Sequence, residues 1–217
     1  KNVIHLSFGW AIPNILLPKS QEKIHHILGE KINNKMKKFK SIEESQLTIT
    51  ELMLPSHSNF SGKIHGGHIL NLMDQIAFAC ASKHSSNYCV TASVNKVDFL
   101  NPIEVGELLT LKASVNYTGR TSMVVGLRVE SENIRTGEKK HCNSSYFTMV
   151  AKDENGKSTP VPGIILTCKD EIRRYARSII RQKEGRNRTS RFSTNSFKTE
   201  DYLELLAQSN SKIELKD

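Results

Sequence analysis

The chain has 217 residues with a formal net charge of +9, and 37% of its residues are hydrophobic. This length allows one domain, alone or with extensions, and the positive charge suits polyanionic ligands without identifying one. The cysteines show no paired spacing, which excludes a disulfide framework and a cysteine-based zinc site: Cys80, Cys89, Cys142 and Cys168.

Residues 1–45 are predicted to form an N-terminal extension. Its apolar part, Val3–Pro18, is interrupted by Pro13 and polar residues, so neither a membrane span nor a secretory signal is expected. The basic part, Ile24–Lys40, has apolar residues at helical spacing and is expected to dock on the protein's own core. A helix lying on a membrane or on a partner subunit is the alternative. We expect a cytoplasmic protein without an integral membrane segment, and organelle targeting by the extension stays open.

Residues 46–162 carry the pattern of a folded domain. Leu47–Met53 alternates with period two and predicts a strand, and a glycine-containing loop then leads into a helix that ends near His84. This helix is apolar on nearly every side, so we expect it to be buried over most of its surface. Four more strands follow, and their short connections predict antiparallel pairing between sequence neighbours: Tyr88–Phe99, Leu108–Tyr117, Ser122–Glu132 and Lys139–Ala151. The expected class is α+β, an antiparallel sheet of about five strands curled around one long central helix.

Residues 163–217 are predicted to form a basic helical C-terminal extension. A helix is expected over Asp170–Gln182, a flexible linker over residues 183–198, and a short acidic helix over Glu200–Gln208. No nucleic-acid partner is expected, because no aromatic residues or nucleic-acid motif accompany the arginines on one side of the first helix. We interpret these arginines as a solvated face, and phosphate groups or acidic neighbours in an oligomer are competing uses: Arg173, Arg174, Arg177 and Arg181.

One acid interrupts the apolar helix. Burying an ionised carboxylate costs several kcal/mol unless it is paired or touches a wet site, so Asp74 marks a cavity, a specific partner or a solvated stripe. Gly66 and Gly67 stand where the loop becomes the helix. Glycines let the backbone approach a ligand, and the first free N–H groups of a helix suit a developing oxyanion.

Gly67 and Asp74 are seven residues apart, so they share one face of the helix. Along the axis, however, they are separated by about 10 Å, and one reacting carbon cannot lie about 3 Å from both. If both groups act on one substrate, two chains must supply them. A two-fold antiparallel arrangement would then give two equivalent sites per homodimer.

The segment Asn59-x-x-Gly62-x-x-His65-Gly66-Gly67, followed by Leu72-Met73-Asp74, resembles the hotdog-fold acyl-CoA thioesterases of the cytosolic acyl-CoA hydrolase group. The similarity spans about Leu47 to Pro162. Further matching segments are Val90-Thr-Ala-Ser-Val-Asn95, Val97-Asp-Phe-Leu-Asn-Pro102, Val105-Gly106-Glu107, Gly119-Arg-Thr-Ser122, Phe147-Thr-Met-Val-Ala151 and Pro160-Val-Pro162.

The resemblance implies an enzyme of fatty acid and lipid metabolism that hydrolyses a fatty acyl-CoA thioester to a free acid and CoA, with no metal and no cofactor. Asp74 would be the general base, or a nucleophile that forms an anhydride. Gly67, with Gly66, would polarise the thioester carbonyl, and Asn59 would orient the water or the carbonyl. His65 is either a further catalytic residue or a loop histidine packed beside the site.

The resemblance also places CoA contacts at a turn between two strands and, more weakly, at a lysine pair: Arg120, Thr121 and Ser122, then Lys139 and Lys140. Gln75 departs from the family, which often has glutamate there, so we expect no second essential carboxylate. A homodimer is the expected minimal active unit, and the open sheet face leaves a trimer of dimers open. Two alternatives are a hotdog hydratase or dehydratase that uses a catalytic histidine, and a non-catalytic acyl-CoA-binding module.

Overall fold

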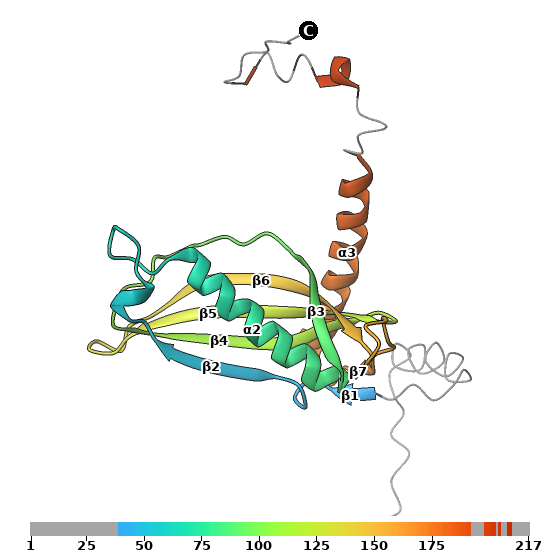
Figure 1. The fold of residues 1–217 in the computed structure, drawn as a ribbon, viewed down its shortest axis with the longest axis horizontal. Coiled ribbons are helices and arrows are strands. Elements are labelled where there is room, and N and C mark those ends of the chain that lie inside the picture. Colours follow the sequence, from blue (N-terminus) through green and yellow to red (C-terminus); the bar gives the residue numbers. More distant parts are fainter. Residues whose placement is uncertain (1–38, 192–197, 203, 205–207, 210–217) are drawn as a thin grey trace, which may run out of the picture. The chain divides into compact units, whose positions relative to one another are not determined.

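A computed structural model describes residues 39–191, 198–202, 204, 208 and 209. In this part of the chain a five-stranded antiparallel sheet, ordered β2-β4-β5-β6-β3, curls around the long helix α2 (Gly66–Ser85) (Figure 1). This arrangement confirms the predicted α+β class. The predicted N-terminal arm and nearly all of the basic helix lie outside the described residues. The strands are β2 (Leu47–Leu52), β3 (Tyr88–Val94), β4 (Glu107–Thr118), β5 (Ser122–Asn133) and β6 (Lys139–Lys152).

The core lies between the sheet and α2. Apolar side chains at alternate positions of the central strands point toward the helix, as the period of a strand requires. Each such side chain contributes about 1.5–3 kcal/mol when it is fully buried. The fully enclosed members include Leu109, Leu111, Val115, Val125, Val129, Phe147 and Met149 from the sheet, and Met73, Ile76 and Cys80 from α2.

Strand β3 corrects two predictions. It ends at Val94 rather than at Phe99, and it pairs with β6 rather than with its sequence neighbour β4. Residues 95–106 are too long a connection for a tight hairpin. This segment stays extended beside β6, where Asn95 N–H donates to Tyr146 O and Leu100 N–H to Cys142 O, but these isolated hydrogen bonds do not form a ladder.

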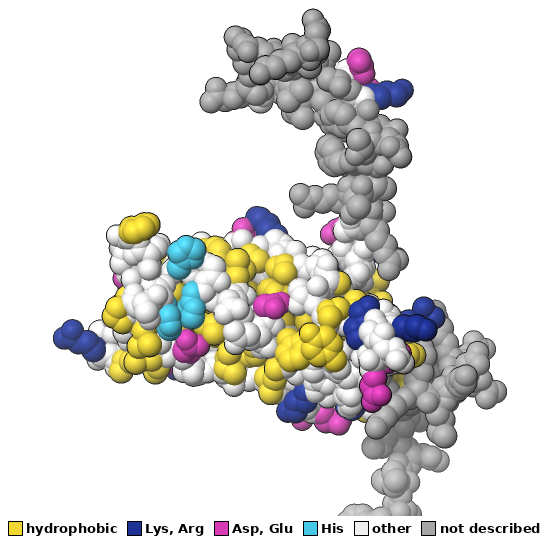
Figure 2. Space-filling view, viewed as in Figure 1, with side chains coloured by type: hydrophobic (Ala, Val, Ile, Leu, Met, Phe, Trp, Pro, Cys, Tyr) yellow, Lys and Arg dark blue, Asp and Glu magenta, His cyan; other side chains and the backbone are white. Residues whose placement is uncertain are grey.

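The burial predicted for α2 is wrong for a single chain. Ile69, Leu72 and Ile76 face the sheet, but the opposite side, which includes Asn71 and Asp74, is exposed. Apolar side chains gather on this open face of the molecule (Figure 2). Large exposed apolar residues on or beside it include Phe78, Tyr88, Val94, Phe99 and Leu100. Monomeric proteins rarely expose such a contiguous patch.

The segments that flank the sheet include β1 (Phe39–Ser41), which pairs in parallel with β7 (Gly163–Ile165), and the helix α3 (Lys169–Arg191), which contacts β4. Helix α3 continues into the predicted linker, because the Lys, Glu and Arg residues there are strong helix formers that outweigh one glycine. The described residues also form the short 3₁₀ helices η1 (Pro55–His57) and η2 (Thr199–Tyr202), and η2 lies where the acidic helix was predicted to begin. No helix in the described part of the chain is long and apolar enough to cross a membrane.

Candidate active site

Asp74 lies on the exposed face of α2, and a threonine of the neighbouring strand fixes its carboxylate. Thr91 Oγ1 donates a hydrogen bond of 2.6 Å to Asp74 Oδ1. Strand β3 has a register shift between Thr91 and Ser93, and such bulges re-aim the side chains beside them. The other carboxylate oxygen has no hydrogen-bond partner among the described residues. Sequence reasoning did not single out Thr91, which stood within a matching segment without an assigned role.

An open hollow of about 440 Å³ adjoins this carboxylate. Its walls come from the middle of α2 and the first half of β3, so most of its lining is apolar. Asp74 and Gln75 supply polar groups from the helix, and Thr91 supplies one from the strand. The remaining lining residues are Phe78, Tyr88, Cys89 and Val90.

The start of α2 is capped by a histidine. His65 precedes the helix, and its Nδ1 accepts a hydrogen bond of 3.0 Å from the Gly67 N–H. The Gly67 amide, which was the first candidate for the oxyanion donor, is therefore occupied in this conformation. The Gly66 N–H has no hydrogen-bond partner among the described residues, so it is the amide that a ligand can use. His65 thus has a structural role, and it holds its ring against the backbone of the site.

A second hollow, of about 370 Å³, lies beside Gly66 and is lined mainly by apolar side chains. A Cβ atom at position 66 would lie 3.2 Å from Phe99 Cζ, a distance tighter than ordinary van der Waals contact. The small residue therefore keeps the backbone of the helix start close to this hollow. The apolar lining comprises Ile64, Ile69, Phe99, Leu100, Pro102 and Ile103.

Asn59 shapes the loop that leads to α2. Its Oδ1 accepts hydrogen bonds from the N–H and the hydroxyl of Ser61 and from the Lys63 N–H, at 2.8–3.2 Å. This is the local capping that asparagine commonly provides in turns. Because the oxygen is engaged, Asn59 has only its Nδ2 donors left for a ligand, and these suit a carbonyl oxygen better than a water's hydrogens.

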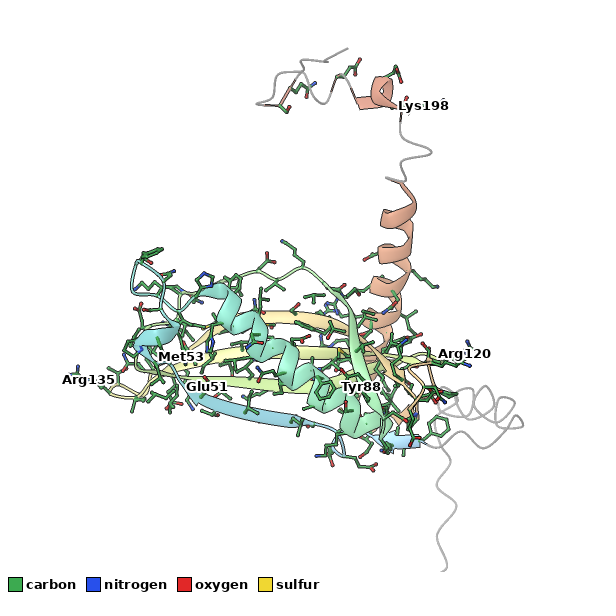
Figure 3. The ribbon with its side chains drawn as sticks, in the orientation of Figure 1. Glu51, Met53, Tyr88, Arg120, Arg135 and Lys198 are labelled. Carbon is green, nitrogen blue, oxygen red and sulfur yellow. The ribbon has the colours of Figure 1, made fainter. Side chains whose placement is uncertain are left out.

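The predicted CoA-binding residues do not lie together in one chain. Arg120, Thr121 and Ser122 occupy or adjoin the β4–β5 turn, whereas Lys139 pairs with Glu132 at the far end of β5. The labels of Arg120 and Arg135, near these two turns, mark opposite ends of the sheet (Figure 3). A strand as long as β5 spans about 35–40 Å. One phosphate group cannot reach both sets unless a second chain supplies one of them.

The lysine pair is also partly neutralised. Lys139 Nζ lies 3.2 Å from Glu132 Oε2, and Lys140 Nζ lies 2.9 Å from Glu107 Oε1. Burial alone would raise the pKa of Glu107, but the Glu104 N–H, Lys140 and Ser131 together hold it below its ordinary value. The Arg120 side chain is exposed and has no ion-pair partner among the described residues.

The candidate groups of one chain therefore fall into two separate sets. Asp74 and Thr91 form one set, and the Gly66 amide with its apolar hollow forms the other. Since both lie on the same unbroken helix, eight residues apart, about 12 Å separates them along the axis.

Comparison with known proteins identifies the family. The model of the thioesterase superfamily matches residues 61–138. Protein VdlD of Helicobacter pylori is 46% identical over 146 residues, which are 67% of this chain and 83% of that protein. The acyl-CoA thioester hydrolase YkhA of Bacillus subtilis is 34% identical over 146 residues, which are 67% of this chain and 85% of that protein. The chain belongs to the hotdog-fold acyl-CoA thioesterases.

Solved structures agree with this assignment. An apo-hexameric acyl-CoA thioesterase superimposes with a TM-score of 0.68 at 40% identity, covering 70% of this chain and 97% of that one. An acyl-CoA hydrolase from Staphylococcus aureus was solved with butyryl coenzyme A and coenzyme A. It has a TM-score of 0.64 at 31% identity, and the match covers 78% of this chain and 99% of that one. Further structures of that enzyme carry an alanine in place of an aspartate, an asparagine or a threonine.

Proposed function

We propose that this protein hydrolyses fatty acyl-CoA thioesters to a free acid and CoA, using Asn59, Asp74 and Thr91. One observation carries the proposal. These residues are separated by 15 and 17 positions, the same separations as between the asparagine, aspartate and threonine replaced in the Staphylococcus aureus hydrolase. The hydrogen bond between Thr91 and Asp74 supports their joint action.

In the proposed reaction Asp74 acts as general base. A water oxygen attacks the thioester carbonyl carbon while its proton passes to the free carboxylate oxygen. The Gly66 N–H and the Asn59 amide stabilise the negative charge that develops on the carbonyl oxygen. The C–S bond then breaks, and the CoA sulfur leaves with the proton held by Asp74.

The nucleophilic alternative is separable from general-base catalysis. If Asp74 attacked the carbonyl carbon, the C–S bond would break and an anhydride would form. Attack of ¹⁸O-labelled water on the Asp74 carbon of this anhydride would leave the label in the protein after a single turnover, so label in the protein identifies the nucleophilic route. General-base catalysis places the label only in the free acid.

A two-chain site reconciles these roles with the separation of about 12 Å along α2. An antiparallel partner helix on the exposed face of α2 would bring the Gly66 amide of one chain beside Asp74 of the other. The exposed apolar residues Phe78, Tyr88 and Phe99 supply surface for such a contact. The hexameric assembly of the relative at 40% identity supports a trimer of such dimers.

The apolar hollow at Gly66 suits the acyl chain, since each buried methylene contributes about 0.8 kcal/mol. In this proposal Arg120, with the hydroxyl groups of Thr121 and Ser122, binds CoA phosphates at the end of the sheet. Lys139 and Lys140 would contribute only from a second chain.

The proposal is tested by free-thiol release from acyl-CoAs of increasing length. Asp74→Asn should lower kcat by about 10²–10⁴-fold, which is the usual contribution of a general base. Asp170→Asn, which removes a carboxylate paired with Arg173 on α3, should leave the rate unchanged. Turnover by Asp74→Asn at the wild-type rate would refute the mechanism.

The same assay separates the alternatives. A hydratase adds water without releasing thiol, and a binding module is stabilised by CoA without turnover. The capping role of His65 favours the hydrolase, because its Nδ1 is occupied by the Gly67 amide.

A further inference from the structure

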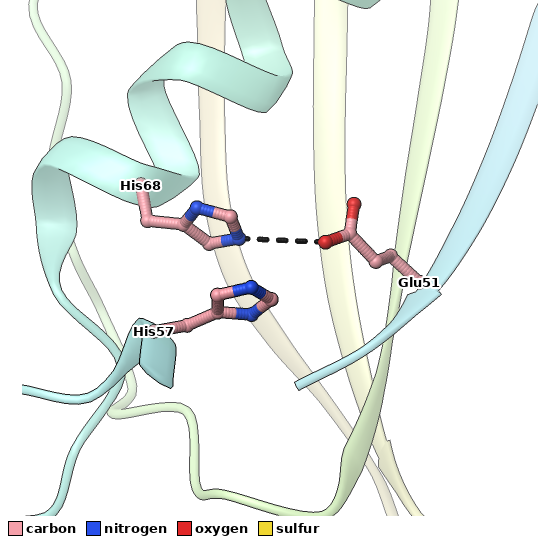
Figure 4. A group of neighbouring side chains, drawn as sticks. All are labelled: Glu51, His57 and His68. Carbon is pink, nitrogen blue, oxygen red and sulfur yellow. Dashed lines mark ion pairs between the residues drawn. The ribbon is translucent and has the colours of Figure 1, made fainter. Parts of the chain in front are cut away.

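A cluster of two histidines and one glutamate lies beside the candidate site but takes no part in the proposed chemistry. Glu51 from β2, His57 from η1 and His68 from α2 converge on one point (Figure 4). The two imidazole rings are stacked, with their centroids 3.9 Å apart and their planes at 21°. One potential ligand atom from each residue lies within 4.8 Å of the others.

The His68 ring faces Glu51 in a long contact, which is an ion pair when the histidine is protonated, but it makes no hydrogen bond through Nε2. This nitrogen is shielded from solvent and lies 3.5 Å from Glu51 Oε1. Buried polar atoms of this kind are rare, and a bound ion is one of the accepted explanations. The nitrogen points at the carboxylate across a gap too wide for a good hydrogen bond.

We propose that Glu51, His57 and His68 bind a divalent transition-metal ion, with Zn²⁺ as the best fit. Zinc ligands at about 2.0–2.2 Å in a tetrahedron lie about 3.3–3.6 Å from one another, which matches the observed separation of His68 Nε2 and Glu51 Oε1. Two imidazoles and one carboxylate favour zinc over the oxygen-seeking Mg²⁺ and Ca²⁺. A fourth position stays open for water.

Binding has two identifiable costs. A metal ion lies near the plane of an imidazole that coordinates it, so one of the stacked rings of His57 and His68 must turn before both nitrogens can bind the same ion. His57 Nδ1 accepts a hydrogen bond of 3.3 Å from the Leu54 N–H, so the neutral ring carries its proton on Nε2. Coordination through Nε2 moves this proton to Nδ1 and breaks the hydrogen bond to Leu54. The bond is longer than typical N–H hydrogen bonds, so its loss is a modest penalty beside three metal–ligand bonds.

The ion would join three segments that frame the loop carrying Asn59. The carbonyl of His57 also accepts a hydrogen bond of 2.8 Å from the N–H of His65, the residue that caps α2. Zinc at His57 would therefore stiffen the path from η1 to the start of α2. Its role is structural, and it does not depend on the proposed hydrolysis.

The test is a zinc titration of the full chain against a chelating indicator, together with the thermal unfolding temperature. All variants carry Cys168→Ser, because Cys168 is the exposed thiol of the chain. His5, His25 and His26, outside the described residues, can also bind zinc, so the variants are compared with one another rather than by total stoichiometry.

We expect zinc to raise the Tm of the parent, and His57→Gln and His68→Gln to weaken zinc binding by about tenfold or more. His141→Gln, a histidine on β6 bonded to Asn143 and Ser144, is the control and should bind as the parent does.

Equal zinc affinity and equal Tm response in His68→Gln and the parent would overturn the proposal. A zinc-soaked crystal provides a second, independent test, because anomalous scattering locates the ion directly. A peak between the three side chains supports the site, and a zinc peak found only elsewhere refutes it. Mg²⁺ and Ca²⁺ should leave the Tm unchanged, and stabilisation by these ions equal to that by zinc would refute the assigned ligand class. Because thiol release by Asp74 is measured separately, failure of the zinc site leaves the proposed hydrolysis untouched.

Discussion

The amide at the start of α2 can be deleted with little disturbance to the backbone. Gly66 is the first residue of the helix, where proline is well tolerated because its missing N–H has no intrahelical partner. The preceding residue, His65, has φ −66° and ψ 128°, the extended conformation that a following proline requires. Gly66→Pro therefore removes the N–H that we assign to the oxyanion and preserves the local fold.

The expected loss follows from the role of that amide. Removing one oxyanion donor typically lowers kcat by about 10²–10³-fold, or about 2.7–4 kcal/mol of transition-state stabilisation. Gly66→Ala is the matched control, because it adds the same Cβ against Phe99 and keeps the N–H. Phe99 is 49% exposed and can move aside, so the alanine variant should lose less than about tenfold.

Thiol release under saturating acyl-CoA measures kcat for both variants, and urea unfolding confirms that each is folded. A loss in Gly66→Pro no larger than in Gly66→Ala would show that crowding, not the amide, matters. The Gly66 N–H would then be excluded as the oxyanion donor.

Three further outcomes are expected. Thr91→Val should lower kcat by about tenfold, or about 1.4 kcal/mol, because the Asp74 carboxylate loses its orienting hydrogen bond. Thr91→Ser keeps the hydroxyl and should retain most activity. Equal kcat values for the valine and serine variants would contradict this role. Burial lowers the pKa of His84 below its ordinary 6.5, so the unfolded chain gains the proton first and the free energy of unfolding should fall as pH drops below about 6.5. In His84→Gln that part of the slope should vanish, and an unchanged slope in urea titrations at several pH values would refute it. Gly126→Ala should destabilise the protein by about 1–3 kcal/mol in urea, because its Cβ would overlap the buried Asn116 amide, and wild-type stability would show that Asn116 can move.

The strands and the helix could be predicted because their signals are local. Period-two alternation places β2, β4, β5 and β6 within one or two residues of their observed bounds. Strand order is a different matter, since it depends on which edges meet after folding. The pairing of β3 with β6 follows from the course of residues 95–106. The local sequence pattern predicted part of this segment as a continuation of the strand.

The candidate site residues likewise differ in whether the sequence alone could identify them. Asp74 and the paired glycines stand out in the sequence because an acid in an apolar helix and a glycine pair are unusual in any context. Thr91 does not, because a threonine in a strand is ordinary until a bulge aims it at a carboxylate. The hydrogen bond from the Gly67 N–H to His65 also depends on the orientation of the imidazole ring, which the spacing of residues does not determine. The zinc ligands Glu51, His57 and His68 follow no motif spacing, since three different elements bring them together.

The central claim is that each active site takes Asp74 from one chain and the Gly66 amide from the other. The most direct test mixes two inactive variants, Asp74→Asn and Gly66→Pro, through unfolding and refolding at equal concentration. In a mixed dimer one site receives both defects and the other receives neither. Random pairing makes about half of the dimers mixed, so thiol release should recover to about one quarter of the wild-type rate. If both groups of a site came from one chain, every site would carry one defect, and a mixture no more active than the two variants alone would contradict the shared site.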